Sequence, residues 1–203
     1  MDAIEYAYFM VGKPYHHGDL REQLLLTGEQ ALAEMPIDDV TLREIARRAG
    51  VSHAAPKHHF ASMADLLGEI AARGFQKFVD ALANAAAQSK SQTAEDRLTA
   101  MGRAYLRFAD NNAAVYGLMF GQVVKMAMTP SLTKSSYEAW AQLENAVAEI
   151  VGPTSAPIGA THAWSCVHGL SMLKAAGRLP PHVSLYAVEE ENLRMMVAGL
   201  KEL

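Results

Sequence analysis

Apolar residues recur at steps of three and four residues along most of the chain, which is the spacing of one face of an α-helix. Alanine and methionine are plentiful, and no run of alternating β-branched residues suggests a sheet. The pattern predicts helices over residues 18–35, 62–87, 93–111, 112–120, 131–151 and 158–177, and a last one that includes 193–200. We therefore predict an all-α protein.

Residues 41–60 have the layout of two short helices joined by a tight turn. Thr41 and Glu44 stand at the spacing of a capping box, in which each side chain bonds to the backbone N–H of the other residue. Gly50 is placed where the first helix ends in the left-handed backbone region, and Ser52 is placed to cap the second helix. This layout predicts a helix-turn-helix, whose second helix is presented to the major groove of DNA.

Positive charge gathers in the same stretch, whereas the whole chain carries a net charge of −4. Four arginine and lysine residues and three histidines stand there against a single glutamate. A local excess of cations and hydrogen-bond donors is typical of a surface that contacts phosphates. A helical hairpin with an ordinary solvated basic face is the alternative.

A family resemblance follows from these residues. Residues 41–52 read Thr-Leu-Arg-Glu-Ile-Ala-Arg-Arg-Ala-Gly-Val-Ser, and residues 55–60 read Ala-Pro-Lys-His-His-Phe. They resemble the DNA-binding signature of the tetracycline-repressor (TetR) family of transcriptional regulators, and the similarity extends through 15–21 and 64–67. The family usually has tyrosine where this chain has Lys57, which can still contact a phosphate as a point charge.

The resemblance implies a regulator of double-stranded DNA, with a near-palindromic operator whose half-sites lie about one helical turn apart, ~34–36 Å. Phosphate contacts are expected from Thr41, Arg43, Lys57, His58 and His59. Contacts with base edges are expected from Ser52, His53, Ala54 and Ala55.

Three segments follow from the breaks in the pattern. Residues 1–14 form an N-terminal arm whose role the sequence leaves open, and residues 15–87 form the DNA-binding domain. A polar break at 88–92 precedes a ligand-binding and dimerisation domain at 93–203. The helix at 62–87 would connect the two domains, so that a ligand could tilt it and change the spacing of the two recognition helices.

A small-molecule effector is expected inside the helical bundle of the second domain. Flexible methionines and aromatic rings suit an apolar or aromatic ligand, although core packing is the alternative for each residue. The candidate lining residues are Met101, Tyr105, Phe108, Tyr116, Met119, Phe120, Tyr137, Trp140, Trp164 and His168.

Residues 164–169 also resemble the Trp-x-x-x-His-Gly signature of one C-terminal domain subclass of the family. A single histidine on an apolar helix is usually a hydrogen-bonded core residue. We expect that structural role for His168, with ligand contact as the alternative.

The helix at 158–177 is apolar nearly all round, and the last helix carries a single apolar stripe. Two such helices per subunit can form a four-helix interface across a two-fold axis, although they could also complete a monomeric core. The candidate residues for this homodimer interface are Val167, Leu170, Leu173, Leu193, Met196, Val197 and Leu200.

Other classes of protein find little support. The chain has no nucleophile motif, phosphate-binding glycine loop or metal-ligand spacing, so neither an enzyme nor a cofactor is expected. The single cysteine, Cys166, suggests a reducing compartment, and no stretch is apolar enough to span a membrane, so we expect a cytoplasmic protein. The prediction is a homodimeric repressor. The alternatives are a protein–protein adaptor that retains a helix-turn-helix and, less favoured, an all-α enzyme that uses the bundle pocket.

Overall fold

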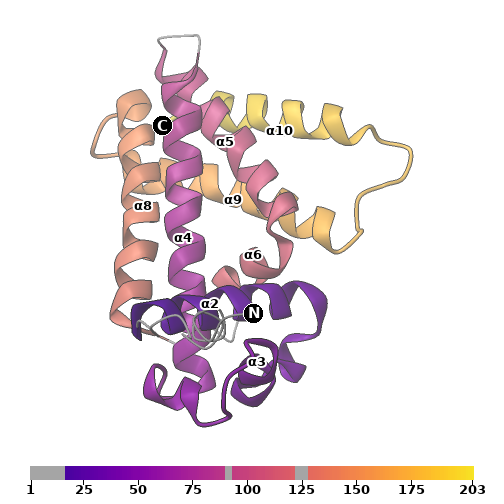
Figure 1. Cartoon of the computed structure of the whole chain (residues 1–203). Coiled ribbons are helices and arrows are strands. Elements are labelled where there is room, and N and C mark those ends of the chain that lie inside the picture. Colours follow the sequence, from indigo (N-terminus) through magenta and orange to yellow (C-terminus); the bar gives the residue numbers. More distant parts are fainter. Residues whose placement is uncertain (1–16, 90–92, 122–127) are drawn as a thin grey trace, which may run out of the picture. The chain divides into compact units, whose positions relative to one another are not determined.

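The computed structural model describes residues 17–89, 93–121 and 128–203, and within these ranges the chain is helical and contains no strand (Figure 1). The predicted all-α class is confirmed. The elements are α2 (His17–Glu34), η1 (Ile37–Asp39), α3 (Leu42–Arg48), η2 (Ala55–His58), α4 (Met63–Ala87), α5 (Ala94–Asn111), α6 (Ala113–Phe120), α8 (Pro130–Val151), α9 (Ala156–Ala175) and α10 (Leu185–Leu200). The predicted N-terminal arm lies outside the described residues.

The chain divides into two compact units, Met1–Leu66 and Leu67–Leu203. The division falls one turn into α4, whereas the sequence pattern placed it at the polar break 88–92. The reason is that most of α4 packs with the C-terminal helices, as when the Phe78 ring meets Phe108 of α5 edge to face at 5.2 Å. A long helix joins the unit in which its apolar face is buried.

The N-terminal unit is held together by the inner face of α2. Leu24 and Leu25 are fully buried, as are Ile45 of α3 and Phe60 just after η2. The side-chain amide of Gln23 also donates to the carbonyl of Ala49 at 3.1 Å and fixes α2 against the end of α3.

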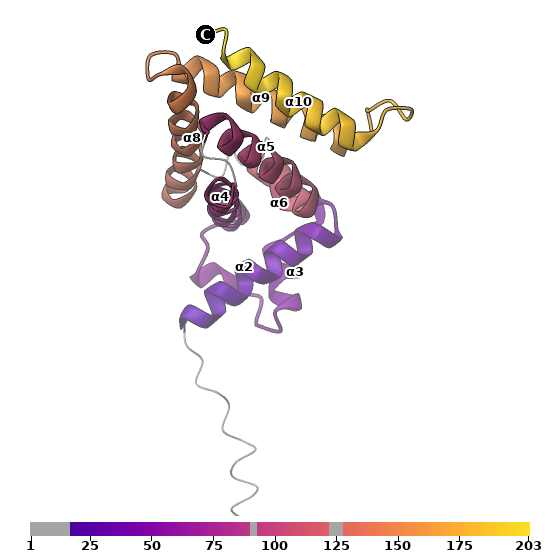
Figure 2. The ribbon, with the colours of Figure 1, turned by 90° about the horizontal axis from the view of Figure 1, so that it is seen from above.

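In the C-terminal unit, α5 lies at the centre and contacts α6, α8, α9 and α10. Figure 2 shows α4 end-on between α8 and α5, with α9 and α10 as a layer on the far side of α5. Helices α5 and α10 approach each other closely at Gly102. A Cβ added to this glycine would lie 2.4 Å from Cδ2 of Leu193 in α10.

The predicted set of homodimer-interface residues needs a correction. Five of its residues are buried within the single chain and cannot add area to a contact between chains: Val167, Leu170, Leu193, Met196 and Leu200. They pack where α9 and α10 meet each other and α5. Only Leu173, which is exposed, and Val197, which is half-buried, are accessible.

In the part of the chain that the structure describes, no helix is both long enough and apolar enough to cross a membrane.

Candidate nucleic-acid interface and ligand cavity

The predicted N-cap of α3 is present, although only half of the capping box forms. The Thr41 hydroxyl accepts a hydrogen bond from the backbone N–H of Glu44 at 3.1 Å. The Glu44 carboxylate turns away from Thr41 and accepts hydrogen bonds from Arg47 and Arg48 instead. These three hydrogen bonds join two charged groups, whereas the one bond that a full box would add joins the carboxylate to a neutral backbone N–H.

The turn after α3 has the predicted left-handed glycine. Gly50 has φ +70°, its N–H donates to the carbonyl of Arg47, and the N–H of Val51 donates to the carbonyl of Ala46. These two bonds form a Schellman motif, which ends the helix and redirects the chain. The turn thus sets the direction in which the next segment leaves α3.

The recognition segment differs from the sequence prediction. It is a tight 3₁₀ turn, and the Ser52 side chain caps nothing among the described residues, so that prediction is wrong. The carbonyl of Ser52 accepts from the N–H of Ala55 at 3.0 Å, and the next such bond joins Lys57 N–H to the carbonyl of Ala54. Pro56 explains the change. An α-helix requires the backbone N–H of a residue to donate to the carbonyl four residues earlier, and proline has no N–H.

The predicted DNA-contacting residues lie mostly at the surface. Exposed side chains belong to Thr41, Arg43, Ser52, His53, Ala54, Lys57 and His58, while Ala55 and His59 are half-buried. Pro56 and Phe60 are buried beneath them and anchor the segment. A buried anchor under exposed polar residues allows the segment to meet another molecule without refolding.

The four arginine and lysine side chains of the helix-turn-helix form two groups, one with ion pairs and one without. Arg47 and Arg48 form ion pairs with Glu44, and Arg48 also pairs with Glu34. Arg43 and Lys57 make no ion pair with any residue in the described ranges, so they remain available to a phosphate. The arginine hydrogen bonds lower the pKa of the Glu44 carboxyl to about 2, so it is ionised at neutral pH and partly neutralises the patch.

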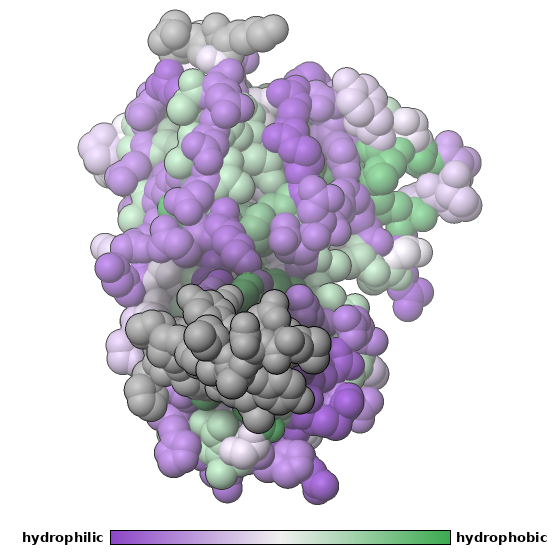
Figure 3. Space-filling model, in the orientation of Figure 1, coloured by the Kyte–Doolittle hydropathy of each residue, from purple (hydrophilic) through white to green (hydrophobic). Residues whose placement is uncertain are grey.

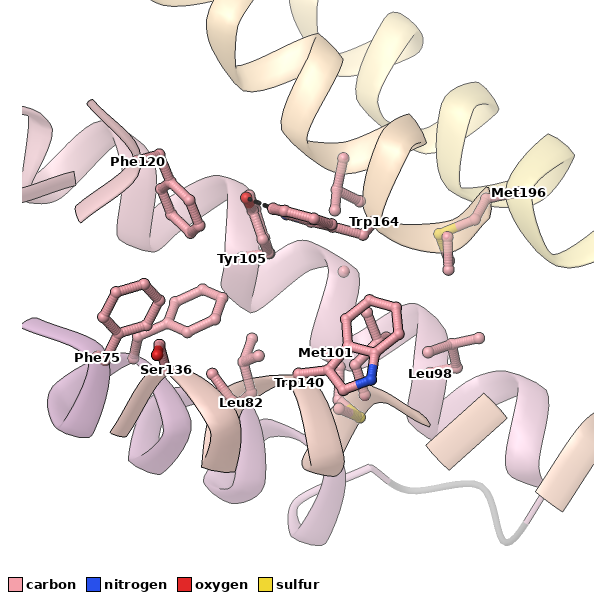
Figure 4. A pocket seen from close by; sticks show the side chains of 16 residues that line it. Phe75, Leu82, Leu98, Met101, Tyr105, Phe120, Ser136, Trp140, Trp164 and Met196 are labelled. Atoms are coloured by element: carbon pink, nitrogen blue, oxygen red, sulfur yellow. Dashed lines mark hydrogen bonds between the residues drawn. The ribbon is translucent and has the colours of Figure 1, made fainter. Parts of the chain in front are cut away.

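A cavity of about 240 Å³ lies inside the C-terminal unit (Figure 4). Its wall is almost wholly apolar, and no charged side chain contributes to it. The lining residues are Phe75, Phe78, Leu82, Leu98, Met101, Gly102, Tyr105, Phe120, Ser136, Ala139, Trp140, Leu143, Ala163, Trp164, Val167 and Met196. Such a cavity suits an uncharged, apolar or aromatic molecule, because an ion would lose its hydration there.

Half of the predicted lining residues reach this cavity, namely Met101, Tyr105, Phe120, Trp140 and Trp164. The other five lie elsewhere: Phe108, Tyr116, Met119, Tyr137 and His168. Tyr137 is 71% exposed, because Trp140 and Ser136 on the same helix take the inward face.

Sequence reasoning missed the contribution of helices outside the predicted pocket segment. Phe75, Phe78 and Leu82 come from α4, and Met196 comes from α10. The apolar stripe of the long helix is visible in the sequence, but a stripe does not show that part of it faces a cavity.

His168 lies behind the cavity in a hydrogen-bond cluster. Its Nδ1 is 2.9 Å from the Tyr105 hydroxyl and 2.8 Å from the Tyr116 hydroxyl, and the two hydroxyls are 2.9 Å apart. The indole N–H of Trp164 donates to the Tyr105 oxygen at 3.3 Å (Figure 4). In a neutral His168 whose Nδ1 carries a lone pair, Nδ1 accepts a hydrogen bond. The Tyr105 hydroxyl then donates to the Tyr116 oxygen, and the Tyr116 hydroxyl donates to Nδ1 of His168, so that each hydroxyl proton has an acceptor.

Burial lowers the pKa of His168 below its ordinary value of 6.5, in agreement with a neutral ring. A lowered pKa means that the unfolded chain binds more protons than the folded chain as the pH falls below about 6.5. The contribution of His168 to stability is therefore complete above pH 6.5 and decreases below it.

We expect His168→Asn to reduce the loss of melting temperature between pH 7.5 and pH 5.5, because asparagine keeps a hydrogen-bonding group and does not titrate. His182→Asn, at an exposed histidine, should leave that loss unchanged. Thermal melts at the two pH values measure both, and equal losses in wild type and His168→Asn would contradict the neutral assignment.

Among the described residues, no group of three or more histidine, cysteine or acidic side chains is placed to hold a metal ion.

Comparisons with known proteins bear on both units. A family model described as bacterial regulatory proteins of the tetR family matches residues 24–70, and one described as a tetracyclin repressor-like C-terminal domain matches residues 98–199. No curated protein sequence matches the chain.

Solved structures resemble most of the chain, across both units. A protein of unknown function from Rhodococcus sp. RHA1 is 31% identical, with a TM-score of 0.81, and the match covers 94% of this chain and 100% of that one. A TetR family transcription regulator from Marinobacter aquaeolei VT8 is 17% identical, with a TM-score of 0.66 and coverage of 88% and 93%. The fatty acid degradation regulator FadR from Bacillus halodurans is 12% identical, with a TM-score of 0.68 and coverage of 90% and 97%. The last two similarities are evidence for the fold alone.

Proposed function

Since the chain belongs to the tetracycline-repressor family of transcriptional regulators, we propose that it is a homodimeric repressor that an uncharged apolar or aromatic molecule releases from its operator. The observation that carries the proposal is the pairing of two features in one chain. One is a helix-turn-helix with Arg43 and Lys57 available to phosphates, and the other is an apolar cavity in the second unit.

The path from ligand to DNA would run through α4. This helix begins in the N-terminal unit, and further along it Phe75, Phe78 and Leu82 line the cavity. A ligand in the cavity therefore touches the helix whose first turn belongs to the DNA-binding unit. A shift of α4 would change the spacing of the two recognition segments, which must match two half-sites at once.

The homodimer is proposed through the outer faces of α9 and α10. Exposed apolar side chains there include Ile158, Leu173, Tyr186 and Met195. Two helices from each subunit would form a four-helix contact, which needs about 800 Å² from each partner to be stable.

Lys57→Ala tests the DNA contact. Each lost phosphate contact reduces the magnitude of the slope of log K against log salt by about 0.9. A dimer contains two copies of Lys57, so the variant should have a slope smaller by roughly 2 and a lower affinity. Fluorescence anisotropy with a duplex from the protein's own upstream region, at several salt concentrations, measures this. The matched control is Lys134→Ala, a strongly exposed lysine of the C-terminal unit, which should change neither quantity.

Wild-type protein that binds no duplex at low salt would contradict the proposal and favour a protein–protein adaptor. Equal effects of Lys57→Ala and Lys134→Ala would contradict the assigned contact and leave the function to be tested by footprinting.

Ser136→Leu tests the effector site. The larger side chain enters the cavity and should raise the ligand concentration needed for half-release of DNA at least tenfold, because the space it takes is lost to the ligand. Thr133→Leu, an exposed position one turn earlier on α8, is the control. Titration of DNA release with an aromatic hydrocarbon series measures the response, and an unchanged response would place the effector elsewhere.

A further inference from the structure

Two exposed histidines accompany Lys57 in the recognition segment. His53 lies at its start and His58 directly follows Lys57, and both side chains are exposed. Neither ring forms a hydrogen bond or an ion pair with any residue in the described ranges. Hydrophilic residues, in purple, make up most of the visible surface around α3 at the bottom of Figure 3. Both rings are therefore available to another molecule.

The 3₁₀ turn decides which of its side chains face outward. In a 3₁₀-helix, residues three apart lie on the same side. Pro56 is buried and His59, three residues later, is half-buried, so this side faces the protein. Lys57 and His58 lie on the other sides and are exposed. His58 therefore stands beside Lys57 on the surface expected to meet phosphates, whereas His59 is turned inward.

The histidines lie in a positively charged stretch. Residues 41–60 have a net charge of +3 when their histidines are neutral, because four arginine and lysine residues stand against one glutamate. That glutamate, Glu44, is already bound by Arg47 and Arg48. It is therefore not available to a protonated histidine.

Carboxylates of the neighbouring elements are also not paired with these rings. Glu34 pairs with Arg48, and Asp65 accepts a hydrogen bond from the backbone N–H of Ala61. Among the described residues, no carboxylate forms an ion pair with a histidine of the recognition segment. The charged side chains that these elements contribute are Arg21, Glu22, Glu29 and Glu34 of α2, Asp38 and Asp39 of η1, and Asp65 of α4. In the free protein, no ion pair favours the charged form of the rings.

DNA would supply the missing negative partner. Histidine is the side chain whose charge changes between pH 5 and pH 8, and a nearby phosphate favours its protonated form. We propose that His53 and His58 take up protons when the protein binds DNA, so that the affinity for DNA rises as the pH falls. Each protonated ring adds one positive charge and a charged donor for a phosphate oxygen. This inference rests on the proposed function and adds regulation by pH to regulation by a ligand.

Duplex binding at pH 8.0 and pH 6.0 tests the proposal. Uptake of one proton per dimer changes the affinity tenfold for each pH unit, so we expect binding at least about tenfold tighter at pH 6.0. The slope of log K against log salt should be larger in magnitude by roughly 2 at pH 6.0, because each His58 of a dimer then contacts a phosphate. Fluorescence anisotropy at constant ionic strength, with a duplex from the protein's own upstream region, measures the affinities.

The two ways to fail are distinct. Equal affinity at the two pH values would overturn this inference and leave the proposed function intact. Absence of duplex binding at both pH values would overturn both. Acid destabilisation through His168 would weaken binding at pH 6.0 rather than strengthen it, and circular dichroism at that pH reports whether the chain is folded.

Variants assign the effect to the two rings. The double variant His53→Gln with His58→Gln keeps hydrogen-bonding groups but cannot become charged, so its affinity ratio between the two pH values should fall below about threefold. His58→Arg carries a permanent charge and should bind about three- to tenfold tighter than wild type at pH 8.0. A double glutamine variant with the wild-type ratio, or His58→Arg without a gain at pH 8.0, would overturn the proposal.

Other histidines provide matched controls. His182 is exposed in the C-terminal unit, and His182→Gln should keep the wild-type ratio. The double variant His16→Gln with His17→Gln removes the two histidines of residues 16–17 and should also keep it. Loss of the ratio in either control would place the proton uptake outside the recognition segment and would overturn the proposal.

Discussion

Gly50→Val is expected to lower operator affinity at least thirtyfold while the C-terminal unit stays folded. Gly50 has φ +70°, and its Schellman turn sends the chain from α3 into the recognition segment. A β-branched residue in this backbone region costs about 2 kcal/mol, and relief of that strain would rearrange the turn. Since 1.4 kcal/mol corresponds to about tenfold in affinity, a cost of ~2 kcal/mol is roughly thirtyfold for each recognition segment.

The chain offers a matched control for this substitution. Gly152 at the end of α8 has φ +78°, and an added Cβ there also meets no atom within 4 Å. Gly152→Val should strain the C-terminal unit at least as strongly, because ψ 162° places Gly152 in a backbone region that essentially only glycine adopts, and should leave duplex affinity within about threefold of wild type. Fluorescence anisotropy measures affinity, and circular dichroism melts report folding. Equal losses of affinity in the two variants would show a general effect of strain and would contradict the role of the turn.

Gly102→Leu is expected to lower the free energy of unfolding by about 1–3 kcal/mol, because its Cβ overlaps the Leu193 side chain and one of the two must move. A Cβ at this position would lie 2.4 Å from Cδ2 of Leu193, whose side chain is fully buried, so the side chain has to shift within the core. The close contact of α5 with α10 therefore requires glycine. Urea unfolding measures the change.

Two comparisons isolate this cause. Gly117→Leu, in a helix and with open space around the added Cβ, should gain up to about 1 kcal/mol from helix propensity. Leu193→Ala alone should cost about 2–5 kcal/mol, but combined with Gly102→Leu it should cost less than the sum, because the new side chain fills the space left. Additive costs would mean that the two residues do not meet.

The sequence by itself determined the local features of this protein. The caps Thr41, Ser62 and Thr93 each accept a hydrogen bond from an N–H three residues ahead, and Gly50 ends α3 as predicted. Helix bounds and the helix-turn-helix were predictable for the same reason, since they depend on contacts within a few residues along the chain. Pro56 also acts locally, since its missing N–H turns the recognition segment into a 3₁₀ turn.

Only the tertiary structure decided which helix faces meet. It placed Phe75 of α4 and Met196 of α10 in the cavity, left Tyr137 exposed, and buried Leu193 inside one chain where a dimer contact was expected. A stripe of apolar residues shows that a helix has a face to bury, but it does not identify the partner that covers it. That partner is set by the packing of helices far apart in the sequence, which no local pattern encodes.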